Sequence, residues 1–170
     1  MPTSLQELIK FLRIERSINR NRKSRTLITL FRIAQYFNMG NRFNPLRAIS
    51  SINFKIISEW TAGCDIPINT SIGIGLRIYH PSSIAINDLT TIGKNVTLRQ
   101  NSTIGHKIAG GKCPIIGDNV DIGANVCIIG NVQIQGNNFI GAGSVVVNDV
   151  LFGQTVVGNP AKPLKNKSQN

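Results

Sequence analysis

Residues 115–150, IIGDNVDIGANVCIIGNVQIQGNNFIGAGSVVVNDV, repeat an aliphatic residue every six positions. A helix repeats every 3.6 residues and a strand every two, so a period of six matches neither alone. The period fits a short strand followed by a corner, with each aliphatic side chain facing a common axis and glycine permitting the tight turn. Three such hexads would close one triangular coil. The repeated residues are Ile116, Ile122, Ile128, Ile134, Ile140 and Val146.

The same period extends upstream, with one interruption. A two-residue slip between Ile84 and Ile92 separates two runs of the series. Residues 106–114, HKIAGGKCP, keep the frame but lose the pattern, which predicts an excursion loop that is either functional or a tolerated insertion. We therefore predict a mainly β protein, a parallel β-helix of about five coils over residues 65–157. The upstream aliphatic residues are Ile66, Ile72, Ile78, Ile84, Ile92, Leu98 and Ile104.

The first sixty residues carry helical patterns instead. Ser4 is placed to be the N-cap of a first helix, and a third, less regular candidate runs over residues 46–60. The predicted organisation is a basic helical region at 1–60, a β-helix at 61–158 and a tail at 159–170. The apolar stripes are Leu5, Leu8, Ile9 and Leu12 in the first helix, Leu27, Leu30, Phe31, Ala34 and Phe37 in the second, and Ile49, Ile52, Phe54 and Ile57 in the third.

Charge is concentrated at the N-terminal end of the chain. The net charge is +11, and residues 1–60 hold eleven of the 19 Lys and Arg residues but only three of the eight acids. Such a basic segment attracts polyanions or an anionic membrane surface, and we predict that residues 1–25 contact such a membrane. Nucleic acid is not expected as a partner, because no aromatic interleaving and no known motif accompany the charge.

Three cysteines without metal-type spacing favour reduced thiols over a disulfide framework. No apolar run is long enough to span a bilayer, and no signal peptide precedes the first helix. These features predict a cytoplasmic protein that is either free or peripheral on the inner membrane face.

Residues 57–164 resemble the serine acetyltransferase branch of the hexapeptide-repeat transferases. The resemblance implies a left-handed coil, a homotrimer and acetyl-CoA as co-substrate. The handedness is taken from the resemblance alone, because ordinary parallel crossovers are right-handed. The matching motifs are CDIP at 64–67, IYHP at 78–81, IGKNV at 92–96, GGKCP at 110–114, IGAGSVV at 140–146 and VGNPAK at 157–162.

By the same resemblance, His80 is the general base and Asp65 holds its other ring nitrogen. The chemistry agrees, since a hydroxyl is a poor nucleophile until a base with a pKa near 7 removes its proton. An aspartate beside the imidazole would fix the tautomer and stabilise the imidazolium. Their separation of fifteen positions is close to one coil, so the two side chains could lie on adjacent rungs. The alternatives are a surface histidine at a corner and an aspartate that only forms a turn.

For acetyl-CoA, the resemblance places Ala124, Ala142 and Gly143 along the pantetheine arm, and Lys162 near the phosphates. No metal is expected. The zinc of a carbonic anhydrase of this fold needs three histidines, and the chain has only two, His80 and His106.

The acceptor is where the sequence departs from the family. Serine-using members carry Asp where this chain has Tyr79, and Arg-His where it has Lys112-Cys113. Their longer N-terminal region supplies a further carboxylate, for which Glu59 is the only candidate here.

We therefore predict an acetyl-CoA-dependent O-acetyltransferase acting on a sugar hydroxyl in surface polysaccharide (capsule or O-antigen) biosynthesis. Tyr79, His106 and Lys112 would contact the acceptor, the tyrosine supporting the apolar face of the sugar ring. The alternatives are a serine O-acetyltransferase of cysteine biosynthesis and a non-catalytic β-helix that binds a partner.

Overall fold

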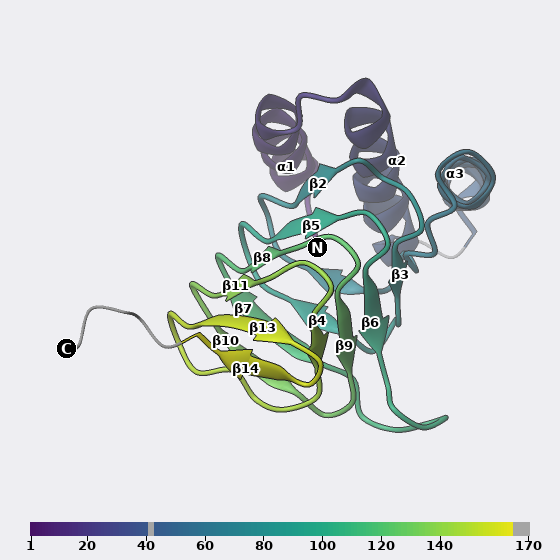
Figure 1. Ribbon diagram of the computed structural model, residues 1–170. Coiled ribbons are helices and arrows are strands. Elements are labelled where there is room, and N and C mark those ends of the chain that lie inside the picture. The colour runs from purple at the N-terminus through teal and green to yellow at the C-terminus, as the bar shows by residue number, and fades with distance from the viewer. Residues whose placement is uncertain (41–42, 165–170) are drawn as a thin grey trace.

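The computed structural model describes residues 1–40 and 43–164. Its larger part is a parallel β-helix of five coils, whose strands form three sheets around one core, parallel except for the last strand, β14 (Figure 1). Sheet B contains β1 (Ser71–Ile72), β4 (Thr91–Ile92), β7 (Ile115–Asp118) and β10 (Gln133–Gly136). Sheet C contains β2 (Arg77–Tyr79), β5 (Thr97–Arg99), β8 (Asp121–Ile122), β11 (Phe139–Ile140), β13 (Thr155–Gly158) and β14 (Ala161–Pro163). Sheet A contains β3 (Ala85–Ile86), β6 (Thr103–Gly105), β9 (Cys127–Ile129) and β12 (Val145–Val146).

The six-residue period produces ladders of aliphatic side chains inside the coil. Ile72 pairs with Ile92, which pairs with Ile116, which pairs with Ile134 on successive coils of sheet B. All four side chains are at most 2% exposed. The predicted fold class, a mainly β protein with about five coils and an N-terminal helical region, is confirmed.

One detail of the predicted register is wrong. Tyr79 pairs with Arg99, and Ala85 pairs with Thr103, so the corner after β2 is two residues longer than the corner after β5. The slip therefore falls at residues 80–81 and not between Ile84 and Ile92. The aliphatic Ile84 is buried at this corner, where it imitates a position of the regular series.

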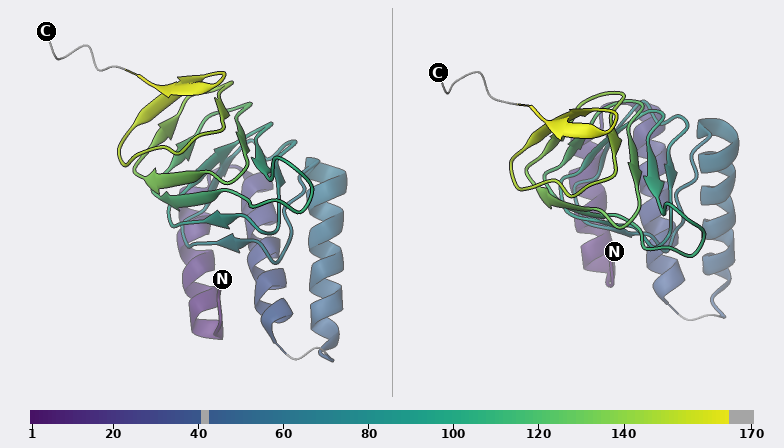
Figure 2. Two further views of the ribbon diagram at one scale, coloured as in Figure 1. Left: turned by 90° about the horizontal axis from the view of Figure 1, so that it is seen from below. Right: turned by 60° about the horizontal axis from the view of Figure 1, so that its bottom comes forward.

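Three α-helices and a short π-helix precede the coil. They are α1 (Leu5–Ile18), α2 (Arg22–Met39), α3 (Pro45–Lys55) and the π-helix η1 (Ile56–Thr61). The Ser4 hydroxyl accepts a hydrogen bond from the Glu7 amide at 3.2 Å, which confirms Ser4 as the first N-cap. The α-helices pack at the N-terminal end of the β-helix, where α1 and α2 cover the first coil and α3 lies beside α2 (Figure 2).

The apolar stripes predicted for these helices are only partly buried. In α1 the buried apolar residues are Leu8 and Phe11, whereas Leu5 is exposed, and in α3 only Phe54 is buried while Ile52 is exposed. Spacing identifies an apolar stripe but not the surface that covers it. Within the described residues, no helix combines the length and the apolar character needed to cross a membrane.

The helices complete the hydrogen bonding of the first coil, which has no earlier coil to pair with. Arg32 is fully buried and donates to the carbonyl oxygens of Ile72 at 3.0 Å and Gly73 at 2.6 Å. Glu15 forms a two-pronged ion pair with Arg32 at 2.7 and 3.0 Å and accepts from the Gly75 amide at 3.1 Å. A buried ion pair thus replaces a missing strand.

Two buried amides extend this replacement along the same coil. Asn19 accepts from the Ile78 amide and donates to the Leu76 carbonyl, both at 2.9 Å. Gln35 donates to the Thr70 carbonyl at 3.0 Å. The polar side chains of α1 and α2 therefore fix the helices to one register of the coil.

Candidate active site

His80 occupies the enlarged corner that connects β2 to β3. Its backbone has a φ of 53°, a left-handed conformation that is uncommon outside glycine, and its side chain is exposed. His80 and Pro81 are the two residues that the corresponding corner of the next coil lacks. The imidazole therefore stands on a local enlargement of an otherwise regular edge.

Asp65 lies at the same corner, at the start of the first coil. It forms an isolated parallel bridge with Ala85, and its amide donates to the Ile84 carbonyl at 2.8 Å. The structure therefore brings Asp65 and the corner of His80 together on neighbouring rungs. Both side chains are exposed, and in the described chain no hydrogen bond joins the carboxylate to the imidazole.

The small residues predicted to meet acetyl-CoA share this edge of the coil. The Gly143 amide donates to the Ala124 carbonyl at 2.9 Å, which stacks the two corners that follow β8 and β11. Ala142 and Gly143 are exposed, and a methyl group added at Gly143 would meet no atom within 4 Å. With coils about 4.8 Å apart, this corner lies about 14 Å along the edge from that of His80.

Lys162 lies near the same edge, at the last coil. It lies on β14, which turns back and pairs antiparallel with β13, opposite Val157. Its side chain is exposed. His80, the small residues and Lys162 thus follow one another along one side of the coil.

The other two predicted acceptor contacts lie on a different edge. His106 directly follows β6, and Lys112 lies in the excursion before β7, at the corner between sheets A and B. In a single chain the structure does not bring His106 and Lys112 to Tyr79 and His80.

Cys113, which stands in the same excursion, is buried and its thiol donates to the Asn87 side-chain oxygen at 3.1 Å. Burial raises the pKa of the Cys113 thiol, with a smaller contribution from the charge of Asp88. A neutral thiol in this position offers no charge to a substrate.

A pocket beside Asp65 contains charges of both signs: Glu59, the carboxylate candidate of the sequence analysis, and Lys55, which no motif indicated. The cavity, about 300 Å³, lies between α3, η1 and the first coil, and its lining includes Lys55, Glu59 and Asp65. The Lys55 ammonium lies 3.8 Å from the Glu59 carboxylate, and both side chains are largely solvated. The i, i+4 spacing of the pair was visible in the sequence. Its position against Asp65 was not, because no repeat relates the helices to the coil.

The described residues contain no group of three or more His, Cys, Asp or Glu side chains that could hold a metal ion.

The chain is similar to curated serine acetyltransferases, although no family model matches it. It is 45% identical over 98 residues to the mitochondrial serine acetyltransferase 3 of Arabidopsis thaliana, which covers 56% of this chain and 25% of that protein. It is 38% identical over 125 residues to the serine acetyltransferase of Staphylococcus aureus strain N315, which covers 72% of this chain and 59% of that protein. The chain thus spans between a quarter and about six tenths of these relatives.

Solved structures give the same result over more of the chain. The serine acetyltransferase of Neisseria gonorrhoeae in complex with serine superposes with a TM-score of 0.79 and 30% identity, covering 95% of this chain and 71% of that one. Soybean serine acetyltransferase complexed with serine gives a TM-score of 0.76 and 29% identity, over 92% and 68%. The parallel coil seen here is therefore the left-handed β-helix of these transferases.

These relatives contradict the prediction of polysaccharide O-acetylation. That prediction gave the departures at Tyr79 and Lys112-Cys113 more weight than the shared motifs, on the assumption that groups binding an amino acid must stand at those positions. The pocket beside Asp65 shows that opposite charges can come from the helices instead. By sequence identity, coverage and fold, the chain belongs to the serine acetyltransferase family.

Proposed function

We propose that the chain is an acetyl-CoA-dependent O-acetyltransferase whose acceptor is L-serine. The observation that carries the proposal is the match, at 30% identity over 71% of its length, to a family member solved with serine. The placement of His80 and Asp65 at one open corner of the coil supports it.

In the proposed reaction His80 is the general base. Its ring nitrogen takes the proton of the serine hydroxyl while the hydroxyl oxygen attacks the thioester carbonyl. The resulting imidazolium returns the proton to the sulfur as the carbon–sulfur bond breaks, which yields O-acetylserine and free CoA. Asp65 orients the ring and stabilises its charged form.

Lys55, Glu59 and Asp65 support serine as the acceptor. Free serine is a zwitterion, and a site that prefers it must pair both an ammonium and a carboxylate. Besides Asp65, which serves His80, the pocket of about 300 Å³ offers one basic side chain, Lys55, and one acidic side chain, Glu59.

The edge that carries Ala124, Ala142, Gly143 and Lys162 suits an extended co-substrate. Small exposed residues let a ligand approach the backbone, and a lysine near the end of the edge can pair with phosphate. A serine acetyltransferase of the same fold, at 24% identity and a TM-score of 0.78, has been solved in complex with CoA.

We propose that the active form is a homotrimer. A neighbouring chain would bring its excursion, with His106 and Lys112, to the edge of His80, which one chain leaves open. Exposed apolar side chains on the sheet faces support association, since Ile115 is 51% exposed and Phe139 is 43% exposed. Multi-angle light scattering at micromolar concentration checks this; a monomeric mass would contradict it.

Acetyl transfer to L-serine by purified His80→Ala protein tests the mechanism. Loss of the base should lower kcat by roughly two to four orders of magnitude. Asp65→Asn should lower kcat less, and His106→Ala should leave it within a few-fold of the wild type. If His80→Ala retains normal turnover while His106→Ala is inactive, the assignment of the base is wrong.

A cytoplasmic location and contact between residues 1–25 and an anionic membrane stay predictions. Exposed Leu5 and Ile9 lie on α1 together with Lys10 and Arg13, an arrangement that suits an interfacial helix. Co-sedimentation with anionic vesicles should exceed that with neutral vesicles and should weaken with salt. Equal binding to both kinds of vesicle would contradict the electrostatic contact.

A further inference from the structure

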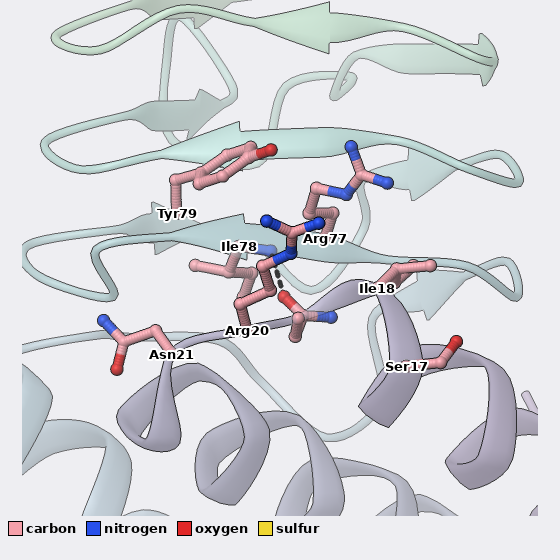
Figure 3. Close-up of a pocket in the computed structure, with 8 residues that line it drawn as sticks. Ser17, Ile18, Arg20, Asn21, Arg77, Ile78 and Tyr79 are labelled. Carbon is pink, nitrogen blue, oxygen red and sulfur yellow. Dashed lines mark hydrogen bonds between the residues drawn. The ribbon is translucent and has the colours of Figure 1, made fainter.

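A second cavity lies where the connection between α1 and α2 crosses the first coil. Its volume is about 570 Å³, and it is lined by residues 17–21 and by β2 (Figure 3). This size lies within the range of small-molecule sites. The lining contains two guanidinium groups, Arg20 and Arg77, and no carboxylate.

The wall of this cavity is held rigidly in place. Asn19 is 2% exposed and bonds to the backbone of β2 and of the residue before it, at 2.9 Å in each case. Its own carbonyl accepts from the Arg25 side chain at 2.6 Å. The position of Arg20, the next residue, is therefore set by a fixed backbone and not by a free loop.

The two arginines lack the compensation that the other arginines nearby possess. Arg32 is paired with Glu15, and Arg99 binds Asp121. By contrast, the Arg77 Nε is buried and has no hydrogen-bond partner among the described residues. Figure 3 shows the Arg20 and Arg77 guanidinium groups extending on the same side of β2. A buried donor without a partner beside a second positive charge favours an anionic ligand.

An aromatic surface adjoins these charges on the side of His80. The Tyr79 ring has the Arg77 guanidinium 5.9 Å and the Arg99 guanidinium 5.3 Å from its centroid, and it remains 43% exposed. Tyr79 directly precedes His80 in the sequence. A molecule held by the arginines can therefore rest on the ring and extend toward the corner of the proposed base.

We propose that this cavity is an oxyanion-binding site, in which Arg77 and Arg20 hold a carboxylate or phosphate group of a small molecule lying against Tyr79. A planar guanidinium donates two parallel hydrogen bonds to either group. The group could belong to the acetyl acceptor, as a carboxylate, or to a nucleotide co-substrate, as a phosphate.

The side-chain Nε–H resonance of Arg77, observed by ¹H–¹⁵N NMR of the full chain, tests the site directly. Inorganic phosphate, L-serine and CoA would be titrated separately at fixed ionic strength. We expect a saturable shift of this resonance with phosphate and with one of the two larger ligands, which identifies the source of the group. Affinities of the variants are measured by isothermal titration calorimetry, because the Arg77 variants lack this resonance. Arg77→Gln and Arg20→Gln should each weaken the binding by roughly ten- to a hundredfold.

Two further variants distinguish specific binding in this cavity from nonspecific electrostatic attraction. Arg13→Gln removes the same charge from an exposed position of α1 outside the cavity lining and should leave the affinity unchanged. Arg77→Lys keeps the charge but loses the planar guanidinium with its two parallel donors, so it should retain only part of the wild-type affinity. Equal weakening by Arg13→Gln, or no saturable shift with any of the three ligands, would overturn the proposal.

Because Arg20 lies on the surface, the Arg20→Gln result remains decisive if an Arg77 variant does not fold. The binding experiment involves no turnover. Normal acetylation of serine without anion binding would therefore reject this site and leave the proposed function intact.

Discussion

The helical region and the coil solve the same problem, unpaired backbone groups, in opposite ways. Inside the coil each strand pairs with the next, so backbone groups satisfy one another and the side chains need only be aliphatic. At the first coil there is no earlier strand, and the buried side chains of Glu15, Asn19, Arg32 and Gln35 take its place. The coil is therefore stabilised by a repeated apolar pattern, whereas its first coil is stabilised by a few polar contacts that occur only once.

This difference determines how each region should respond to substitution. A stack of repeats loses roughly one repeat's share of packing when a core residue is truncated. When a buried polar side chain is removed, the group to which it was hydrogen-bonded stays buried and unsatisfied. The end of the coil should therefore be the more sensitive region.

The largest effect is expected for Arg32→Met. The substitution leaves the Glu15 carboxylate buried without its partner and two carbonyls of the first coil without donors. We expect a loss of about 4 kcal/mol in the free energy of unfolding, measured by urea denaturation. Arg13→Met, on the exposed face of α1, is the matched control and should cost less than about 0.5 kcal/mol. Similar values for both would mean that the ion pair does not hold the helices to the coil.

A smaller loss is expected for Ile122→Ala inside the coil. The side chain is fully buried in β8, and truncation creates a cavity worth about 3 kcal/mol. Hydrogen exchange should rise in β5 and β11, the strands on either side of β8, but not in α1. Faster exchange throughout α1 would show that the coil and its helical end unfold as one unit.

Replacing Asn by Ser in each region should separate the two kinds of turn. Asn21 caps α2 through its side chain, which accepts from the Lys23 amide, and serine can do the same. Asn119 stands at a corner with a φ of 58°, which asparagine tolerates better than serine. We expect almost no change for Asn21→Ser and about 1 kcal/mol for Asn119→Ser by thermal denaturation. A larger loss of stability for Asn21→Ser than for Asn119→Ser would contradict the view that only the corner needs asparagine.

The smallest effect concerns the thiol at the junction of the two regions. Burial raises the pKa of Cys64, which is fully buried, and also that of Cys127, which is only half-buried. The folded state therefore favours the neutral thiol, and this stabilisation is present below the pKa of the unfolded chain and is lost as the pH rises above it. Wild type should lose slightly more stability than Cys64→Ala between pH 8 and pH 10. Iodoacetamide at pH 8 should modify Cys127 first; faster labelling of Cys64 would show that the junction opens.

The sequence alone was sufficient for the coil because its core obeys a period. Each of Ile116, Ile122 and Ile128 indicates the same environment, and the pairing of coils confirms it. The position of the slip was missed because Ile84 is aliphatic and buried at a corner. Glu15 and Arg32 were not singled out, because their partners in the coil are 40 to 61 residues away in the sequence.

The same distinction applies to the candidate site, where some residues follow the repeat and others depend on how the helices dock. His80, Asp65 and the small residues of one edge were indicated by motifs and lie along that edge, although their roles stay proposals. Lys55 and Arg77 were not singled out, because the pockets they line form only when the helices dock on the coil. The polysaccharide acceptor predicted from the motif positions was wrong, and the proposed serine site draws on residues such as Lys55 that no motif indicated.

The antiparallel strand β14 limits how these molecules can assemble. A coil with a bare last strand would offer its edge to the first coil of another molecule, and repeated stacking would give a fibre. Here β14 lies over β13 and ends in Pro163, which has no amide hydrogen to donate, while the opposite end is closed by α1 and α2. Growth of sheet C along the axis is therefore blocked at both ends. This favours association through the sides of the coil, in closed rings of a few chains, over open filaments.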